Sequence, residues 1–203
     1  FNCTGDWAFY IEGDEIYHED DLDKIKKSME LHLNNSNVEA LILDFYHFYG
    51  NTNSILNSPG WYRSEARIIK NSVRSYAPDG LFWLVLDSNK KGRYPKAKHT
   101  GAYCYHYGWA RGEDQMNLKS HKVQQYWGKK HVKIDYTQMD QFIIEEFKGT
   151  HPKVIENWLK NDKGLYKVDS NYKLTKKQKK HRIMIFIENF FGIDLSKKHY
   201  KLV

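Results

Sequence analysis

The alternation of apolar and polar residues predicts a strand and then a helix near the start of the chain. Residues 6–11 are mostly apolar, which is typical of a short buried strand, and an acidic corner follows at 12–15. Asp20 and Asp21 are candidates for a helix N-cap. The helix is indicated by apolar residues at spacings of three and four, namely Leu22, Ile25, Met29 and Leu33.

Further strands are expected up to residue 109. β-forming residues dominate four segments, which are 38–49, 65–71, 81–86 and 101–107. Residues 50–60 are rich in Asn, Ser, Gly and Pro and predict a loop, and residues 87–92 predict a polar turn.

Helical patterns replace the strands in the second half. They cover 114–127 and 152–159, and a last helix is predicted between Thr175 as cap and Gly192 as stop. Its apolar stripe, which we expect to pack on the sheet, consists of Ile183, Ile187, Phe190 and Phe191. The order of elements predicts an α/β fold with ligands at strand ends, followed by a helical C-terminal extension.

Composition narrows the class of protein. The chain has 203 residues, of which 40% are hydrophobic and 15% aromatic, and this content supports a folded core. The mean hydropathy of -0.77 and the absence of an apolar run of membrane length predict no transmembrane segment. No signal peptide is visible, and because the chain begins with Phe1 we expect it to be part of a longer protein.

The counts of cysteine and of charge exclude some roles and leave others open. Cys3 and Cys104 are too few for a disulfide scaffold or a four-cysteine zinc site, and they fit a reducing compartment. The net charge of +7 favours an anionic partner. Nucleic acid, a membrane surface and a nucleotide diphosphate-sugar all meet that condition.

The acidic corner is the strongest local candidate for chemistry. Glu12, Asp14 and Glu15 follow a buried strand, and acids gathered in this way repel one another unless a cation joins them. Carboxylate oxygens suit Mg²⁺ or Mn²⁺, and Gly13 would let the backbone approach a phosphate. The same residues also fit a solvated turn that precedes the helix.

Two further groups of residues could belong to a site. His106 ends a predicted strand and could complete a metal site with Asp14, or be a hydrogen-bonded core histidine. Glu65 and Arg67 share a strand face and could be a base and a phosphate clamp, or a salt bridge. The aromatic side chains that could stack on a sugar, or cover the core, are Trp61, Tyr62 and Trp109.

Six segments resemble, in order, the glycosyltransferase family 2 proteins of bacterial surface-polysaccharide loci and phages. They are GDWAFYIEGDEIYHEDDL (5–22), LDFYHFYGN (43–51), RSEARIIKN (63–71), CYHYGWARGEDQMNLK (104–119), FKGTHPKVI (147–155) and ENFFGIDLSKKHYKLV (188–203). The resemblance spans nearly the whole chain. It implies a partial GT-A fold whose metal-motif and acceptor-binding part is 1–110, with a helical extension at 111–203, and a nucleotide-binding half that precedes Phe1.

The resemblance also assigns roles. Glu12, Gly13 and Asp14 resemble the Asp-x-Asp metal motif, with Glu12 in place of the first Asp. His106 resembles the histidine that completes the metal site, and Glu65 is the best match to the catalytic base, although Ala66 stands where an Asp is usual. Contacts to the diphosphate or acceptor are expected from Arg67, Arg111 and Lys119.

The implied activity is inverting transfer of a sugar from a nucleotide diphosphate donor to a glycan or lipid-linked acceptor in polysaccharide biosynthesis, with Mn²⁺ or Mg²⁺. Two non-catalytic alternatives remain. A nucleic-acid-binding module would need its lysines in a groove, whereas the one cluster, Lys173–Arg182, lies in the tail, so we expect no specific nucleic acid. That cluster could instead contact anionic lipid, which would place a cytoplasmic protein at the inner face of the membrane.

Overall fold

The computed structural model describes the chain except for residues 1–2, 79, 88–91, 127, 129–132 and 161–168. It is a mixed α/β protein, as the pattern of elements predicted. The chain divides into two compact units. Unit 1 comprises 1–45, 62–105 and 196–203, and unit 2 comprises 46–61 and 106–195. The predicted functional halves, 1–110 and 111–203, follow other boundaries and stay predictions.

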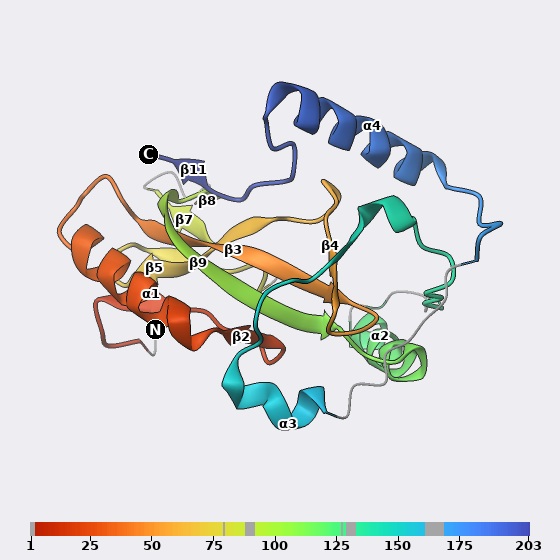
Figure 1. The fold of residues 1–203 in the computed structure, drawn as a ribbon. Coiled ribbons are helices and arrows are strands. Elements are labelled where there is room, and N and C mark those ends of the chain that lie inside the picture. The colour runs from red at the N-terminus through yellow and green to blue at the C-terminus, as the bar shows by residue number, and fades with distance from the viewer. Residues whose placement is uncertain (1–2, 79, 88–91, 127, 129–132, 161–168) are drawn as a thin grey trace. The chain divides into compact units, whose positions relative to one another are not determined.

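The main strands agree with the sequence pattern (Figure 1). The strands are β1 (Trp7–Phe9), β2 (Glu15–Tyr17), β3 (Ala40–Tyr49), β4 (Ser54–Leu56), β5 (Ser64–Lys70), β6 (Ser75–Tyr76), β7 (Leu84–Leu86), β8 (Gly92–Arg93), β9 (Lys96–Trp109), β10 (Ile144–Glu146) and β11 (Lys201–Leu202). The helices are α1 (Glu19–His32), α2 (Glu113–Tyr126), α3 (Glu156–Leu159) and α4 (Lys176–Phe191), with 3₁₀ turns η1 (Gln141–Ile143) and η2 (Lys153–Ile155).

Unit 1 is built around β5, all of whose residues are buried. β5 lies between β1 and the first part of β3 and is antiparallel to both. β9 pairs with β2 and, in parallel, with β11, so the sheet is mixed. A strand buried on both faces usually has a continuous apolar pattern, as β3 does. β5 is buried throughout although it contains Glu65 and Arg67.

Helix α1 packs on this sheet through two of the four residues that its periodicity indicated, Ile25 and Met29, whereas Leu22 and Leu33 are exposed. Ile25 is buried and Met29 packs against the same cluster, which also contains Leu41 and Ile68. The predicted cap was wrong: the N-cap is His18, whose Nδ1 accepts a hydrogen bond of 3.2 Å from the backbone N–H of Asp20. Aspartates 20 and 21 fall within the first turn, where their charge favours the helix dipole.

Unit 2 holds the far ends of β3 and β9 together with α2, α3 and α4. The predicted loop 50–60 contains a strand, β4, which pairs with β3 and with β10. The core of this unit includes Tyr49, Met116, Tyr136 and Ile185. The predicted helix at 152–159 is a 3₁₀ turn followed by the four residues of α3, and the predicted turn 87–92 lies largely outside the described residues.

Helix α4 has the predicted ends but not the predicted buried face. Thr175 forms a capping box with Gln178, and Gly192 ends the helix with a left-handed φ of 64°. The buried residues of α4 are Ile185 and Glu188. The stripe that was expected to pack is instead largely exposed, with Ile183, Phe190 and Phe191 among the exposed residues.

Candidate functional site

The acidic corner is a tight turn between β1 and β2. The backbone N–H of Glu15 donates to the carbonyl of Glu12 at 3.1 Å, so Gly13 and Asp14 occupy the tip. The Glu15 carboxylate also accepts a hydrogen bond of 3.1 Å from the backbone N–H of Glu12. The turn is therefore closed by its own side chain and holds one backbone shape.

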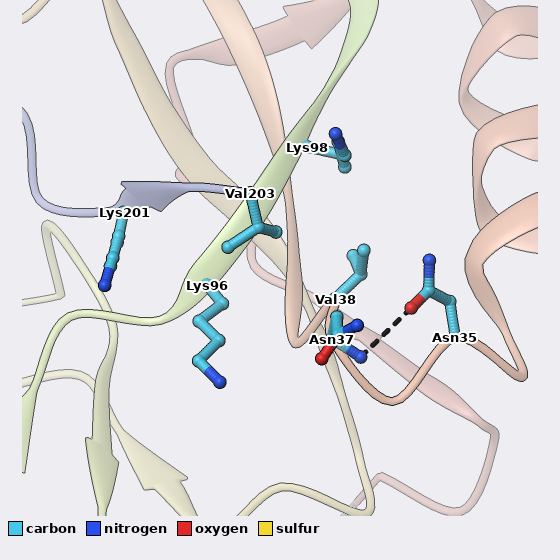
Figure 2. A pocket seen from close by; sticks show the side chains of 7 residues that line it. All are labelled: Asn35, Asn37, Val38, Lys96, Lys98, Lys201 and Val203. Carbon is cyan, nitrogen blue, oxygen red and sulfur yellow. Dashed lines mark hydrogen bonds between the residues drawn. The ribbon is translucent and has the colours of Figure 1, made fainter.

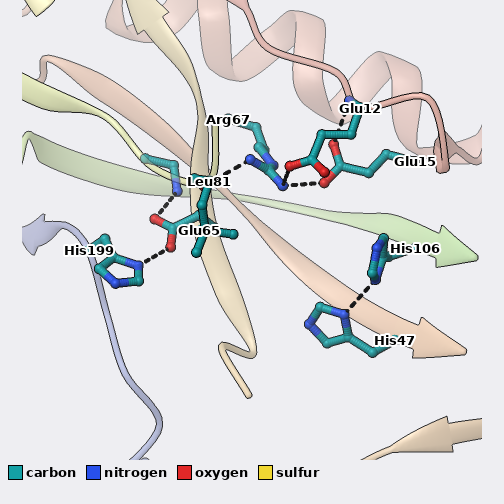
Figure 3. Close-up of polar contacts among 9 residues, drawn as sticks. Glu12, Glu15, His47, Glu65, Arg67, Leu81, His106 and His199 are labelled. Carbon is teal, nitrogen blue, oxygen red and sulfur yellow. Dashed lines mark hydrogen bonds and ion pairs between the residues drawn. The ribbon is translucent and has the colours of Figure 1, made fainter. Parts of the chain in front are cut away.

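Arg67 reaches this turn from β5 and pairs with two of its three acids (Figure 3). Its guanidinium is 1% exposed and donates to the carboxylates of Glu12, at 3.0 Å, and Glu15. It also donates to the carbonyl of Leu81 at 2.9 Å. The sequence suggested a salt bridge between Arg67 and Glu65, whereas Arg67 instead pairs with Glu12 and Glu15 of the acidic corner.

Burial and neighbouring charges shift the pKa values of this network in opposite directions. Burial raises the pKa of Glu15, and the Arg67 charge counteracts that effect. Burial alone would lower the pKa of Arg67, but the neighbouring Glu15 carboxylate and other groups outweigh it and the pKa is raised. Removing one partner from such a buried pair leaves an uncompensated charge, so the three side chains depend on one another.

The tip of the turn is the accessible part of the corner. Gly13 is exposed, and a Cβ placed on it would meet nothing within 4 Å. Asp14 is partly exposed, whereas Glu15 is buried. Glu12 and Glu15 turn toward Arg67, whereas Asp14 lies at the tip of the turn and is partly exposed to solvent.

Glu65, two residues before Arg67, is engaged elsewhere. Its carboxylate is fully buried and lies 2.5 Å from Nδ1 of His199 (Figure 3). Phe82 stacks on the imidazole at 4.3 Å between ring centroids. The Nε2 atom of His199 is buried and has no hydrogen-bond partner among the residues that the structure describes. Sequence analysis missed His199, because a partner 134 positions away has no local signal.

His106 pairs with another histidine in unit 2. Nδ1 of His106 lies 2.9 Å from Nδ1 of His47 (Figure 3), so one ring donates and the other accepts. Two of the predicted sugar-binding aromatics belong to the same cluster: Trp61 lies 5.2 Å from the His47 ring and 5.5 Å from the ring of Trp109. The structure therefore brings together three of the predicted site residues around an unpredicted fourth, His47.

The proposed metal pairing stays a prediction. Asp14 belongs to unit 1 and His106 to unit 2. Within the described part of the chain, no group of three or more His, Cys, Asp or Glu side chains is arranged to hold a metal ion. Tyr62 also belongs to unit 1, where it packs edge-on against Phe45 at 5.0 Å and burial raises its pKa.

Arg111 and Lys119 line one surface pocket of unit 2. The pocket has a volume of about 550 Å³, and Lys122, Leu118 and Val123 also line it. Lys119 donates to the carbonyl of Gly108 at 3.1 Å. Three cationic groups beside two apolar side chains give this pocket a lining suited to an amphiphilic anion.

A second basic pocket lies in unit 1 and was not predicted. Lys96 and Lys98 on β9 and Lys201 on β11 line a cavity of about 470 Å³ beside Val38 and Val203 (Figure 2). Asn35 and Asn37, which follow α1, complete its lining. None of the residues that line this pocket is acidic.

Comparisons with known proteins identify no relative: no family model, no curated protein and no solved structure matches this chain. Among the described residues, none of the helices combines the length and the apolar character that crossing a membrane requires.

Proposed function

We propose that the chain is part of a metal-dependent glycosyltransferase that uses a nucleotide diphosphate-sugar donor. The observation that carries the proposal is the Glu12–Glu15 turn, in which Arg67 holds two acids and the tip presents Gly13 and Asp14. The GT-A type of fold belongs to this proposal, and the mixed α/β architecture is compatible with it.

The donor atoms at the tip fit a hard divalent cation. Mg²⁺ and Mn²⁺ are commonly held by one or two carboxylates together with substrate phosphates, so a single accessible carboxylate is a sufficient protein contribution. Asp14 would hold the ion, which when bound supplies positive charge opposite the diphosphate. Arg67 would act as a positioning residue, because it fixes the backbone on both sides of Asp14.

The proton of the acceptor hydroxyl must pass to a base as the oxygen attacks the anomeric carbon. Glu65 stays our candidate, and the contact with His199 refines its role. A carboxylate that accepts from Nδ1 leaves Nε2 of a neutral imidazole as the atom able to take a proton. Both side chains are buried, so an acceptor would reach Nε2 only after Phe82 or its loop moves.

The pocket of Arg111 and Lys119 is our candidate for the acceptor or the diphosphate. Its cationic groups would pair with phosphate oxygens. Leu118 and Val123 would contact an apolar chain, which favours a lipid-linked acceptor over a free glycan.

The test is paramagnetic broadening of the amide NMR signals of the full chain by Mn²⁺, with and without a panel of nucleoside diphosphates. We expect broadening at residues 12–15 that strengthens with a diphosphate and disappears with EDTA. Asp14→Asn should weaken it at least tenfold, whereas Asp23→Asn, an exposed acid of α1, should leave it unchanged. Broadening at the corner that persists in Asp14→Asn, or none under any condition, would refute the proposal.

A further inference from the structure

Helix α4 carries an exposed aromatic surface that its own unit leaves uncovered. Four large apolar side chains are more than half exposed, namely Ile183 (61%), Phe186 (69%), Phe190 (72%) and Phe191 (64%). The rings contact one another: Phe186 and Phe190 lie 6.4 Å apart, and Phe190 and Phe191 lie 4.9 Å apart. The helix (blue in Figure 1) thus presents a continuous apolar patch rather than scattered residues.

The opposite side of α4 is the one that packs. Ile185 belongs to the core of unit 2, and the buried Glu188 carboxylate accepts from the backbone N–H of Leu195 at 2.7 Å. His181 lies 3.3 Å from the hydroxyl of Ser58, close against Gly60. These contacts orient the helix within unit 2, so the exposure of the aromatic side follows from packing and not from fraying.

Lysines precede the aromatic patch on the same side of the helix. Lys179 lies four residues before Ile183, and Lys176 lies seven before it, spacings that place them on one helical face. The exposed basic side chains of this segment are Lys173, Lys176, Lys177, Lys179 and Lys180. Glu188 is the single acid between 173 and 191, and it is buried on the packed side.

We propose that this face of α4, with the lysines before it, docks on an anionic lipid bilayer. Phenylalanine and isoleucine would enter the boundary between headgroups and acyl chains, while the ammonium groups contact lipid phosphates. The charge pattern favours lipid over a protein partner, because lysine is depleted in protein interfaces whereas its flexible stem reaches a headgroup layer readily. The inference does not depend on the proposed transferase activity.

The test is flotation of the full chain with vesicles. We expect the chain to float with vesicles that contain about one-third phosphatidylglycerol in phosphatidylcholine, and not with phosphatidylcholine alone. Raising the salt from about 0.1 M to about 1 M should release much of it, because exposed charges are screened.

Two pairs of variants separate the apolar and the electrostatic contributions. Phe186→Ser with Phe190→Ser should lower partitioning by about tenfold per inserted ring, and its control is Leu31→Ser, an equally exposed apolar residue of α1. Lys176→Glu with Lys180→Glu should lower it by about 25-fold or more, at about fivefold per lysine.

The control for that charge reversal is Lys26→Glu with Lys27→Glu, which makes the same change in net charge on exposed positions of α1. Circular dichroism confirms that each variant is folded. Equal loss in test and control variants would show a nonspecific effect of charge and overturn the proposal.

A spin label at position 190 identifies what covers the face. In a Cys3→Ser background, Phe190→Cys should become more accessible to oxygen and less accessible to a water-soluble nickel reagent when anionic vesicles are added. An aqueous environment in the presence of bound vesicles would refute the proposal. So would a dimer in sedimentation that forms without lipid and is abolished by the two Phe→Ser changes, since the face would then bind a second copy.

Discussion

Replacing Arg67 by Met should expose how strongly the acidic corner depends on its one buried cation. Methionine keeps much of the side-chain length but leaves the Glu15 carboxylate, which is fully buried, without its counter-ion. Breaking a buried pair in this way costs about 3–5 kcal/mol. For a chain of this size, about 1 kcal/mol corresponds to about 2–4 °C in Tm, so we expect Tm to fall by about 6–20 °C.

The double variant distinguishes a lost charge partner from lost packing. Arg67→Met combined with Glu15→Leu removes both buried charges and should recover most of the stability, because a pair replaced by apolar groups is often neutral. Urea unfolding followed by circular dichroism gives the four free energies of the cycle, and we expect a coupling of more than about 1 kcal/mol. A loss of less than about 1 kcal/mol in Arg67→Met, or a double variant less stable than either single one, would refute the reasoning.

Two other predictions concern the Asp140–Arg182 pair of unit 2 and the glycines Gly192 and Gly13. Burial would raise the pKa of Asp140, but the hydrogen bonds from Arg182, at 2.6 and 2.9 Å, and a backbone amide lower it. A carboxyl group whose pKa is lowered in the folded state stabilises the fold at pH values above its pKa in the unfolded chain. Arg182→Gln should therefore lower the free energy of unfolding by about 1–2 kcal/mol at pH 7. In urea unfolding this loss should become smaller below about pH 4, whereas any loss in the control Lys179→Gln should not change with pH in this way. Gly192→Ala should lower the free energy of unfolding by about 1 kcal/mol, because Gly192 has a φ of 64°. Gly13→Ala should change it by less than about 0.5 kcal/mol, because Gly13 has no positive φ and open space around it. Equal shifts of Tm in the two variants would contradict this prediction.

The regular elements were predictable where the local pattern and the packing agree. Strand β3 is buried along most of its length and forms a nearly continuous apolar run, which made it recognisable from the sequence. Thr175 and Gly192 act through backbone groups a few residues away, and their roles as helix start and stop were predictable for that reason.

The errors share a different physical origin. Strand β4 has only three residues in a segment rich in Asn and Ser, and it exists because β3 and β10 pair with it. The stripe on α4 was correctly found as a stripe, but periodicity does not tell which face meets the core. The burial of Ile185 and Glu188 decides that question, and it depends on residues from other segments.

The candidate site shows the same division between local and long-range information. The acidic turn was recognisable because its acids are adjacent in sequence. The partners that determine what each acid can do are Arg67 and His199, which lie more than fifty positions from Glu12 and Glu65 respectively. Sequence analysis singled out Asp14 as the metal ligand, and the structure adds that Arg67 pairs with Glu12 and Glu15, of which only Glu15 is buried.

The pairing of Arg67 with two of the three acids affects how the corner could bind a cation. A single surface carboxylate binds a divalent cation weakly. Three adjacent carboxylates would repel one another whenever the cation is absent. Arg67, which Glu12 and Glu15 share, offsets one of the negative charges and would keep the backbone of Gly13 and Asp14 in one shape with or without a ligand. Affinity would then depend on the phosphates that arrive with the cation, so the corner would respond to the donor and the ion together rather than to the ion alone.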